Sequence, residues 1–349
     1  MRNYVNRSRR RALAGAVAFA LPPAVAGRST KEIGDATGRR IAVPDRVQRI
    51  FAAGPPASVL AFAVAPEKLI GWTTPFRPAE RPFVPERYAD LPTLGRLTGR
   101  ANTANVEVVL AAQPDVIVDY GAITPTFVSL AQRIQQQTGI PYLLLDGSFD
   151  RMPDAFRTMG TIAGQSARGE SLSRYAEHLL QDVRRRVDAV PPGRRMRVYY
   201  GRGPLGLVTG LAGSINVEII ERAGGVNVAA ELGNGGLVQV SLEQVLRWNP
   251  QVIVTTDPTF FDSVRVDSSW RSIQAVRTGR VYLAPGVPFG WIDFPPSINR
   301  LIGLLWIGRV LYPESFDGNL RAAVRDFYAR MYHRVPTDAQ LEQLLAGTP

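Results

Sequence analysis

Cysteine is absent from the 349-residue sequence, and histidine occurs only twice. Without cysteine the chain forms no disulfides, binds no metal through thiolates and has no cysteine nucleophile. It also has no cysteine to which a lipid anchor could be attached. His178 and His333 lie in separate predicted helices far apart in the chain. We therefore expect no resident metal and no histidine-rich site for a bare metal ion.

Catalytic signatures and long apolar runs are also missing. No Gly-x-Ser-x-Gly sequence occurs, and neither histidine follows a predicted strand, which disfavours a serine nucleophile with a histidine base. Residues 201–206 read Gly-x-Gly-x-x-Gly, but an extended segment follows instead of a helix, so we expect no dinucleotide cofactor. The run 301–311 is interrupted by glycine and arginine, and is too short to span a bilayer. We expect a protein that is not an enzyme, with an exported hydrolase as a remote alternative.

The first 26 residues have the composition of a secretory signal peptide. Residues 2–11 contain five arginines and no acid, an apolar run follows at 12–21, and Ala24-Val25-Ala26 is a small-residue cleavage signal. Ser8-Arg9-Arg10-Arg11 resembles a twin-arginine export signal, although Ala12 stands where an aromatic residue is usual. An ordinary Sec signal is the alternative. We expect export, cleavage near Ala26 and a free periplasmic protein.

The charge distribution argues against a nucleic-acid partner. The formal net charge is +11, and removal of the five arginines in the predicted signal lowers it to about +6. The remaining basic residues are spread along the chain, whereas a nucleic-acid-binding protein needs a clustered basic stripe. The one short run, Arg184-Arg185-Arg186, has Glu177 and Asp182 nearby on a predicted helix. A solvated helix face explains it.

Strands and helices alternate through the remaining sequence, as is typical of βαβ units with parallel sheets. More than 300 residues remain after the predicted signal, which supports two α/β domains. In the first half we predict strands at 49–53, 68–72, 115–119 and 141–145, and helices at 57–64, 106–112 and 126–137. In the second half we predict strands at 197–200, 251–255 and 280–283, and helices at 216–223, 242–248, 297–311 and 320–332.

Two segments, 105–118 and 241–254, repeat one pattern. Each begins with an Asn or Ser that can cap a helix, places a glutamate in the first helical turn, and ends the helix at a proline before a buried strand. Glu107 and Glu243 occupy the equivalent positions. Because the helix dipole favours an acid there, capping alone accounts for both glutamates.

One long helix is predicted between the two halves. Ser166 to Val190 contains no proline, and about 25 helical residues span roughly 37 Å. Pro191-Pro192-Gly193 closes this segment. We therefore expect an N-terminal lobe at 27–165, a linking helix at 166–192 and a C-terminal lobe at 193–349. A rigid helix between lobes allows small rocking movements instead of large hinge closure.

These features resemble the periplasmic iron-siderophore and cobalamin binding proteins of ABC importers. The resemblance is carried by the repeated glutamate segments, by residues 218–227 and by Gly279-Arg280-Val281-Tyr282, and it extends over nearly all of 40–345. It implies the class III periplasmic binding protein fold, with two Rossmann-like lobes joined by a single long helix. It also implies a monomer that delivers a small ligand to a permease dimer in the inner membrane. Glu107 and Glu243 would then dock onto arginines of the permease.

Ligands of open α/β sheets bind beyond the carboxyl ends of the strands. Arg202 follows a strand between two glycines, and its guanidinium suits an anionic ligand, with a surface turn arginine as the alternative. The aromatic segment 288–296 either lines the cleft or covers the core. Arg300 either faces the cleft or pairs with an acid. The candidate ligand-binding residues are Pro55, Trp72, Thr73, Tyr120, Gly121, Arg202, Phe289, Trp291 and Arg300.

The identity of the ligand stays open at this point. A metal chelate is favoured, with an iron-siderophore first and cobalamin or haem as further candidates. An oxyanion such as molybdate or tungstate is the alternative, since a guanidinium and helix N-termini bind oxyanions.

Overall fold

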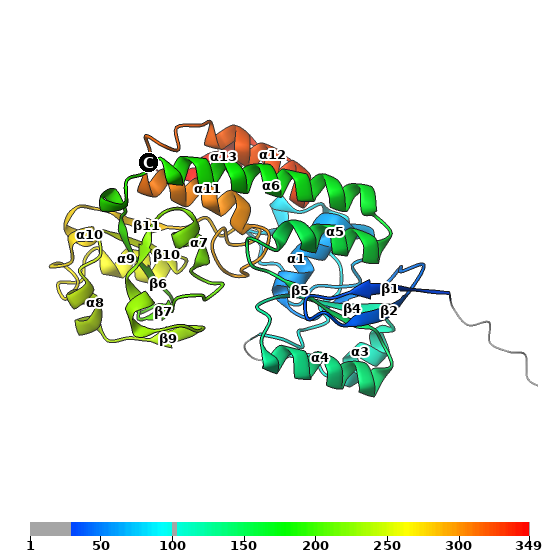
Figure 1. Cartoon of the computed structure of the whole chain (residues 1–349). Helices are drawn as coiled ribbons and strands as arrows, with labels where there is room; N and C mark the ends of the chain where they lie inside the picture. Colours follow the sequence, from blue (N-terminus) through cyan, green and yellow to red (C-terminus); the bar gives the residue numbers. More distant parts are fainter. Residues whose placement is uncertain (1–28, 100–102, 349) are drawn as a thin grey trace, which may run out of the picture.

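The computed structural model describes residues 29–99 and 103–348, and Figure 1 shows two α/β lobes beneath one long helix. The predicted fold class is confirmed, because each lobe contains a parallel sheet. The predicted signal peptide lies outside the described residues. Within the described residues, no helix is both long and apolar enough to cross a membrane.

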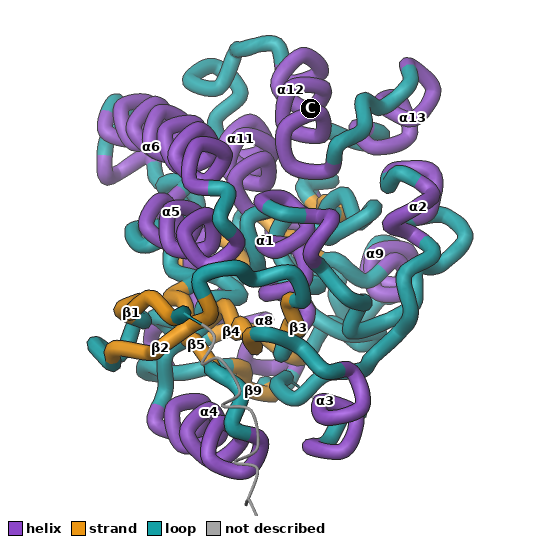
Figure 2. The backbone as a smooth tube through the Cα atoms, turned by 90° about the vertical axis from the view of Figure 1, so that its right-hand side faces the viewer, coloured by secondary structure: helices purple, strands orange, loops and turns teal. Residues whose placement is uncertain are grey.

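The N-terminal lobe is built on a three-stranded parallel sheet in the order β3-β4-β5. Successive residues of the central strand face opposite sides: Val116 and Val118 belong to one apolar cluster, and Ile117 belongs to another. Helices α1 and α5 cover the first face, and α3 and α4 cover the second (Figure 2). The elements are β3 (Ile50–Ala52), β4 (Val116–Gly121), β5 (Tyr142–Asp146), α1 (Pro55–Val64), α3 (Val106–Ala112), α4 (Pro125–Thr138) and α5 (Met152–Ala163).

Smaller elements complete this lobe. An antiparallel hairpin, β1 (Thr30–Gly34) and β2 (Arg40–Pro44), precedes the sheet, and the short helix α2 (Glu86–Ala89) lies in the long connection before α3. Asp35 in the hairpin turn pairs with Arg39, and the N–H of Ala36 donates to Leu144 O at 2.8 Å. The hairpin therefore covers the β5 edge of the sheet.

The C-terminal lobe contains a four-stranded parallel sheet in the order β11-β10-β6-β8. A second, antiparallel pair, β7 and β9, lies beside it. The strands are β6 (Arg197–Gly201), β7 (Val208–Gly210), β8 (Val226–Asn227), β9 (Leu237–Gln239), β10 (Val252–Thr255) and β11 (Val281–Leu283). The helices are α7 (Glu218–Arg222), α8 (Leu242–Trp248), α9 (Pro258–Val264) and α10 (Gln274–Arg277).

The predicted long helix is confirmed as α6 (Ser166–Asp188), which runs above both lobes (Figure 1). It crosses α5 at two glycines. A Cβ added at Gly160 would lie 2.9 Å from the Cα of Gly169, so only glycine allows the helices to approach this closely. Beside the crossing, Arg157 of α5 forms ion pairs with Glu170 and Glu177 of α6. These contacts attach the first lobe firmly to α6. The domain boundaries at 165/166 and 192/193 stay a prediction.

The C-terminal elements α11 (Arg300–Leu311), α12 (Leu320–Tyr332) and α13 (Asp338–Leu345) follow the second sheet. The segment after α12 returns to the first half of the chain. His333 Nε2 lies 2.9 Å from Phe62 O, and Arg334 donates to Val84 O at 3.2 Å. The two halves are therefore joined by these C-terminal contacts as well as by α6.

Three local predictions differ from the structure. Helix α1 begins two residues before the predicted start at 57, because Pro55 and Pro56 occupy its first turn, where their missing N–H groups cost nothing. The segment 68–72, predicted as a strand, forms isolated bridges at Leu69 and Trp72. Helix α11 begins at Arg300, three residues after the predicted start at 297, and the Ser297 hydroxyl donates to Pro56 O at 2.7 Å.

Candidate functional site

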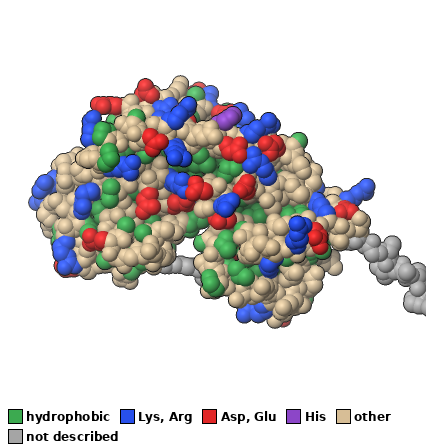
Figure 3. All heavy atoms as spheres, in the orientation of Figure 1, with side chains coloured by type: hydrophobic (Ala, Val, Ile, Leu, Met, Phe, Trp, Pro, Cys, Tyr) green, Lys and Arg blue, Asp and Glu red, His purple; other side chains and the backbone are tan. Residues whose placement is uncertain are grey.

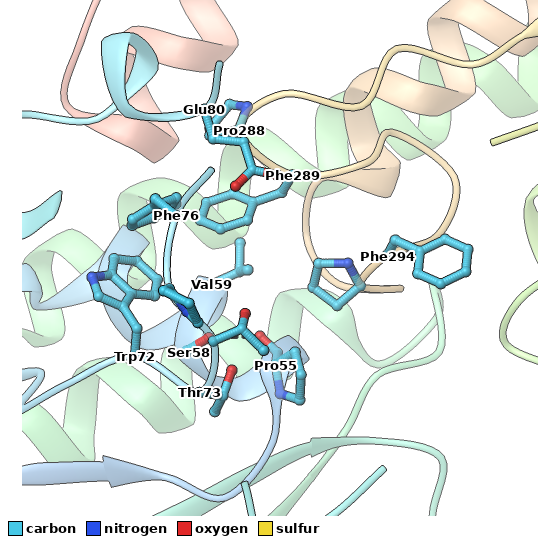
Figure 4. Close-up of a pocket in the computed structure, with 13 residues that line it drawn as sticks. Pro55, Ser58, Val59, Trp72, Thr73, Phe76, Glu80, Pro288, Phe289 and Phe294 are labelled. Carbon is cyan, nitrogen blue, oxygen red and sulfur yellow. Dashed lines mark hydrogen bonds between the residues drawn. The ribbon is translucent and has the colours of Figure 1, made fainter. Parts of the chain in front are cut away.

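A cavity of about 80 Å³ lies between the start of α1, the segment 72–80 and the loop 288–295 (Figure 4). The segments come from the two halves of the chain and are tied to each other by the Ser297–Pro56 hydrogen bond. Four of the predicted ligand residues line the cavity: Pro55, Trp72, Thr73 and Phe289. The other lining residues are Ser58, Val59, Thr74, Pro75, Phe76, Glu80, Pro288, Phe294 and Pro295.

Aromatic rings form one wall of this cavity. The ring centroids of Trp72 and Phe76 are 4.8 Å apart, and that of Phe289 lies 5.8 Å from Trp72 and 5.9 Å from Phe76. The indole N–H of Trp72 donates to Tyr88 O at 2.7 Å, which fixes the ring. The wall is therefore rigid and presents aromatic surface to a ligand.

Few polar groups face the cavity from α1. The two prolines of its first turn have no N–H, and the Ser58 hydroxyl is used by a bond to Pro55 O at 2.8 Å. Glu80 forms an ion pair with Arg77 at 2.6 Å. The N-terminus of α1 thus offers an anion fewer donors than an ordinary helix N-terminus does.

Arg202 does not line the cavity, but it contacts Phe294, one of the lining residues, and is held on two sides. Its Nε donates to Asp293 Oδ2 at 2.7 Å, and its guanidinium carbon lies 4.1 Å from the ring centroid of Phe294, which lines the cavity. Asp293 also accepts a hydrogen bond from the Tyr200 hydroxyl at 3.0 Å. Because the ion pair uses Nε, the terminal amino groups of the guanidinium have donors to offer an anion.

Burial and the neighbouring charge shift the pKa of Arg202 in opposite directions. Burial is the largest single influence and lowers the pKa of Arg202, but Asp293 and Tyr200 together raise it by more, so that the net direction is upward. Burial raises the pKa of Tyr200 well above its ordinary value. The tyrosine hydroxyl therefore stays protonated, and the guanidinium stays charged, at any physiological pH.

The remaining predicted ligand residues do not line the cavity. Trp291 is fully buried, and its indole N–H donates to the Tyr328 hydroxyl at 3.2 Å, so it belongs to the core. Arg300 is fully buried and pairs with Glu218 at 2.9 Å. Of the two roles considered for Arg300, pairing with an acid is the one that the structure shows. Tyr120 is buried as well, and Gly121 packs against Gly147.

Several lining residues were missed by the sequence analysis. Phe76 and Phe294 are the largest of them. The sequence offers a partial signal for each, since Phe76 follows Trp72 by four residues and Phe294 belongs to the aromatic loop. That both residues line one cavity depends on the tertiary fold, which no local pattern encodes. The Phe294 ring itself is turned away from the other aromatic rings (Figure 4).

Glu107 and Glu243 are both exposed, at equivalent places in α3 and α8. The predicted caps are confirmed: Asn105 Oδ1 accepts from the Val108 N–H at 3.1 Å, and Ser241 Oγ accepts from the Gln244 N–H at 3.2 Å. The pKa of Glu243 is lowered mainly by a hydrogen bond from the residue's own backbone N–H, and to a smaller extent by a hydrogen bond from Ser241. Both helices lie on the side of the molecule away from α6 (Figure 1).

An arginine fixes the end of each of these two helices. Arg49 donates to Ala112 O at 2.7 Å and to Gln113 O at 3.0 Å, and Arg197 donates to Trp248 O at 2.6 Å. Arg49 directly precedes β3, and Arg197 is the first residue of β6. The two exposed glutamates are therefore carried by helices that are capped at both ends and anchored to a sheet.

No group of three or more metal-ligating side chains occurs among residues 29–99 and 103–348. His178 lies in α6, and His333 ends α12, where burial lowers its pKa. Basic and acidic side chains are interspersed over the face shown in Figure 3. On that face the charges form no continuous stripe of one sign.

Comparison with known proteins gives consistent matches. The model of the family described as periplasmic binding protein matches residues 84–288. A molybdate-binding protein of Haemophilus influenzae is 28% identical, covering 68% of this chain and 72% of its own. The vitamin B12-binding protein of Vibrio cholerae is 25% identical, covering 67% and 78%. The structure of an ABC transporter solute binding protein from Sulfurospirillum deleyianum superposes with a TM-score of 0.82 at 30% identity, covering 90% of this chain and 98% of its own.

Proposed function

Because this chain belongs to the family of periplasmic binding proteins of ABC transporters, we propose that it captures a small anionic ligand in the cavity between Trp72, Phe289 and Phe294 and delivers it to a permease. One observation carries the proposal. A charged guanidinium, that of Arg202, is fixed beside an aromatic cavity formed by both halves of the chain. We propose no catalytic role for these residues.

The arrangement of Arg202 suits an anion for electrostatic reasons. Asp293 and Phe294 hold the guanidinium before any ligand arrives, so binding costs little side-chain entropy. The side chain is only 12% exposed, and a hydrogen bond made there is less weakened by water than one on the open surface. Carboxylate, catecholate, phosphate or oxyanion oxygens are all suitable acceptors.

A metal chelate, with an iron-siderophore first, is the ligand class that we propose from the sequence and the aromatic walls. Trp72, Phe76 and Phe289 offer ring surfaces against which the organic part of a chelate packs. Cobalamin and haem are further members of this class. The vitamin B12-binding relative supports such a ligand, and the metal would arrive as part of the cargo.

An oxyanion such as molybdate or tungstate is the second candidate, and two observations support it. The molybdate-binding relative from Haemophilus influenzae is 28% identical. The cavity of about 80 Å³ is also smaller than the roughly 300–1,000 Å³ that drug-sized ligands occupy. Arg202 would supply most of the recognition, since the prolines of α1 remove two donors.

Delivery requires a partner, and the repeated glutamates are our proposed contact. Glu107 and Glu243 lie in equivalent exposed helices, one in each lobe, so they present two similar acidic points to a permease dimer. We propose that they pair with arginines of the permease, and that the protein acts as a monomer in the periplasm after export through a twin-arginine or Sec signal.

Binding assays with the mature protein from residue 27 onward test this function. Isothermal titration with a ferric siderophore, cobalamin, haem, molybdate and tungstate should give saturable binding to one class, with sulfate as the control anion. Arg202→Met should weaken that binding while the protein stays folded by circular dichroism. Failure of the folded protein to bind any of these ligands would contradict the proposal.

A further inference from the structure

An ion pair between a fully buried arginine and a partly buried glutamate lies where the two lobes meet. Arg300, the first residue of α11, is fully buried, and its guanidinium donates to Glu218 Oε2 at 2.9 Å and to Ile215 O at 3.1 Å. Glu218 is the first residue of α7. Both partners belong to the second half of the chain, so by themselves these bonds only connect α7 with α11.

The same two side chains also reach the first half of the chain. Arg300 donates to Gly147 O, and its guanidinium carbon lies 4.3 Å from the ring centroid of Phe149. The N–H of Phe149 donates to Glu218 Oε1 at 3.1 Å. Both oxygens of the carboxylate are therefore used, one within its own lobe and one across to residues 147–149, which directly follow β5.

The surrounding contacts leave little room at this junction. A Cβ at Gly147 would lie 2.8 Å from Gly121 Cα and 3.0 Å from Ile215 Cδ1, so backbone and side chain already touch there. Next to it, Arg222 forms an ion pair with Asp150. Separating the lobes here would leave the fully buried charge of Arg300 and the partly buried charge of Glu218 with fewer partners, which is unfavourable in a low-dielectric interior.

The start of α11 connects this junction to the cavity. Ser297, three residues before Arg300, donates to Pro56 O, and Pro55 lines the cavity together with Phe294 and Pro295 of the preceding loop. Any movement of Arg300 relative to Gly147 therefore also moves one wall of the cavity relative to the other.

We infer that Glu218 and Arg300 form an inter-lobe latch that fixes the separation of the two lobes and thereby the width of the ligand cavity. The two side chains are positioning residues and do not contact the ligand. The consequence for ligand capture rests on the proposed function, but the latch itself acts in the absence of any ligand.

Distance measurements between the lobes test the latch directly. Because the chain has no cysteine, Ser129→Cys in α4 and Asp262→Cys in α9, both exposed, give one spin label in each lobe of the full mature protein. Pulsed electron resonance then reports the inter-lobe distance without ligand. Glu218→Gln, which keeps the shape but removes the charge, should add a population at longer distance.

The matched control is Asp35→Asn. Asp35 also forms a buried carboxylate–guanidinium pair, with Arg39, but within the first lobe. The Asp35→Asn variant should show the same inter-lobe distance distribution as the unaltered protein. An unchanged distribution for Glu218→Gln would overturn the inference.

Hydrogen exchange on the unaltered protein provides a second measurement, which does not depend on how well a variant folds. The Phe149 amide should exchange slowly, because its acceptor is a carboxylate of the other lobe. Exchange as fast as in an open loop would overturn the latch. Absence of ligand binding by the unaltered protein would instead contradict the proposed function and leave both of these measurements valid.

Discussion

Arg202 donates to Asp293 across 2.7 Å and thereby links the carboxyl end of β6 to the loop that borders the cavity. Asp293 is almost completely buried, and the Tyr200 hydroxyl also donates to it. The carboxylate therefore holds its position whether or not a ligand is present. A binding protein gains from such an arrangement, because its recognition group is ordered before the ligand arrives.

Removal of this guanidinium should weaken ligand binding. Hydrogen bonds to charged groups contribute about 1.5–3 kcal/mol, so Arg202→Met should raise the dissociation constant of the identified ligand about 10- to 100-fold. Isothermal titration measures the change. Arg265→Met, an exposed arginine of the same lobe, serves as the control and should bind normally. Equal affinities for both variants would remove Arg202 from the site.

Charge reversal at the two repeated glutamates should block delivery but not capture. The variant with Glu107→Arg and Glu243→Arg should retain ligand affinity, because both residues are exposed and lie outside the cavity. Uptake into proteoliposomes that contain the cognate permease should fall to background. The control variant is Glu86→Arg, which changes an exposed glutamate of α2 and should leave the rate of uptake unchanged. Loss of ligand affinity in the double variant would contradict the docking assignment.

The titration of Asp119 should make the stability of the folded protein depend on pH. Burial raises its pKa from 3.8 to about 6, although hydrogen bonds from the Tyr120 N–H, Thr98 and Tyr142 act in the opposite direction. Because the folded protein binds this proton more tightly, the contribution of Asp119 to stability is complete below about pH 4 and is lost as the pH rises through about 6. Ionised Asp119 is therefore a cost at neutral pH.

Asp119→Asn should accordingly raise the free energy of unfolding at pH 7.5, by up to about 3 kcal/mol for a shift of about two pH units. At pH 4 the change should be small, since the aspartate is then neutral too. Urea unfolding at the two pH values measures the difference. An equal effect at both values would show that Asp119 titrates in the folded protein as it does in the unfolded chain.

Where an element has local start and stop signals, its first and last residues could be predicted from the sequence. Helices 106–112 and 242–248 have the predicted bounds because Asn105 and Ser241 cap them, and a proline follows each of them by two residues. The long helix α6 was predicted within two residues because its segment lacks proline. In contrast, β7 and β9 have only three residues each, and they pair although the whole segment 211–236 lies between them, which leaves no local signal.

Apart from Phe289, the lining residues that could be predicted lie at or just after the ends of predicted strands, where position along the chain determines exposure. Arg202 and Thr73 follow strand-like segments and lie at or beside the cavity. Arg300 and Trp291 share the composition of a binding loop, yet both are buried by partners distant in sequence, namely Gly147 and Tyr328. A charged or aromatic residue does not reveal from its neighbours in sequence whether its partner is a ligand or another part of the chain.

The crossing of α5 and α6 allows a test in which packing and helix propensity predict opposite results. Alanine has a helix propensity about 1 kcal/mol better than glycine, so propensity alone predicts that Gly169→Ala is stabilising. A Cβ there would lie 2.6 Å from Phe156 O and 3.0 Å from Gly160 Cα, which forces the helices apart. Overpacking costs about 1–3 kcal/mol, so we expect a net loss and a melting temperature lower by a few degrees.

Gly193→Ala is the control for this substitution, because nothing lies within 4 Å of the added Cβ and the residue is exposed. Its melting temperature should stay within error of the unaltered protein. If Gly169→Ala were as stable as this control, α5 and α6 would separate at little cost, and the firm attachment of the first lobe to the long helix would then depend on the ion pairs of Arg157 instead of on the glycine contact.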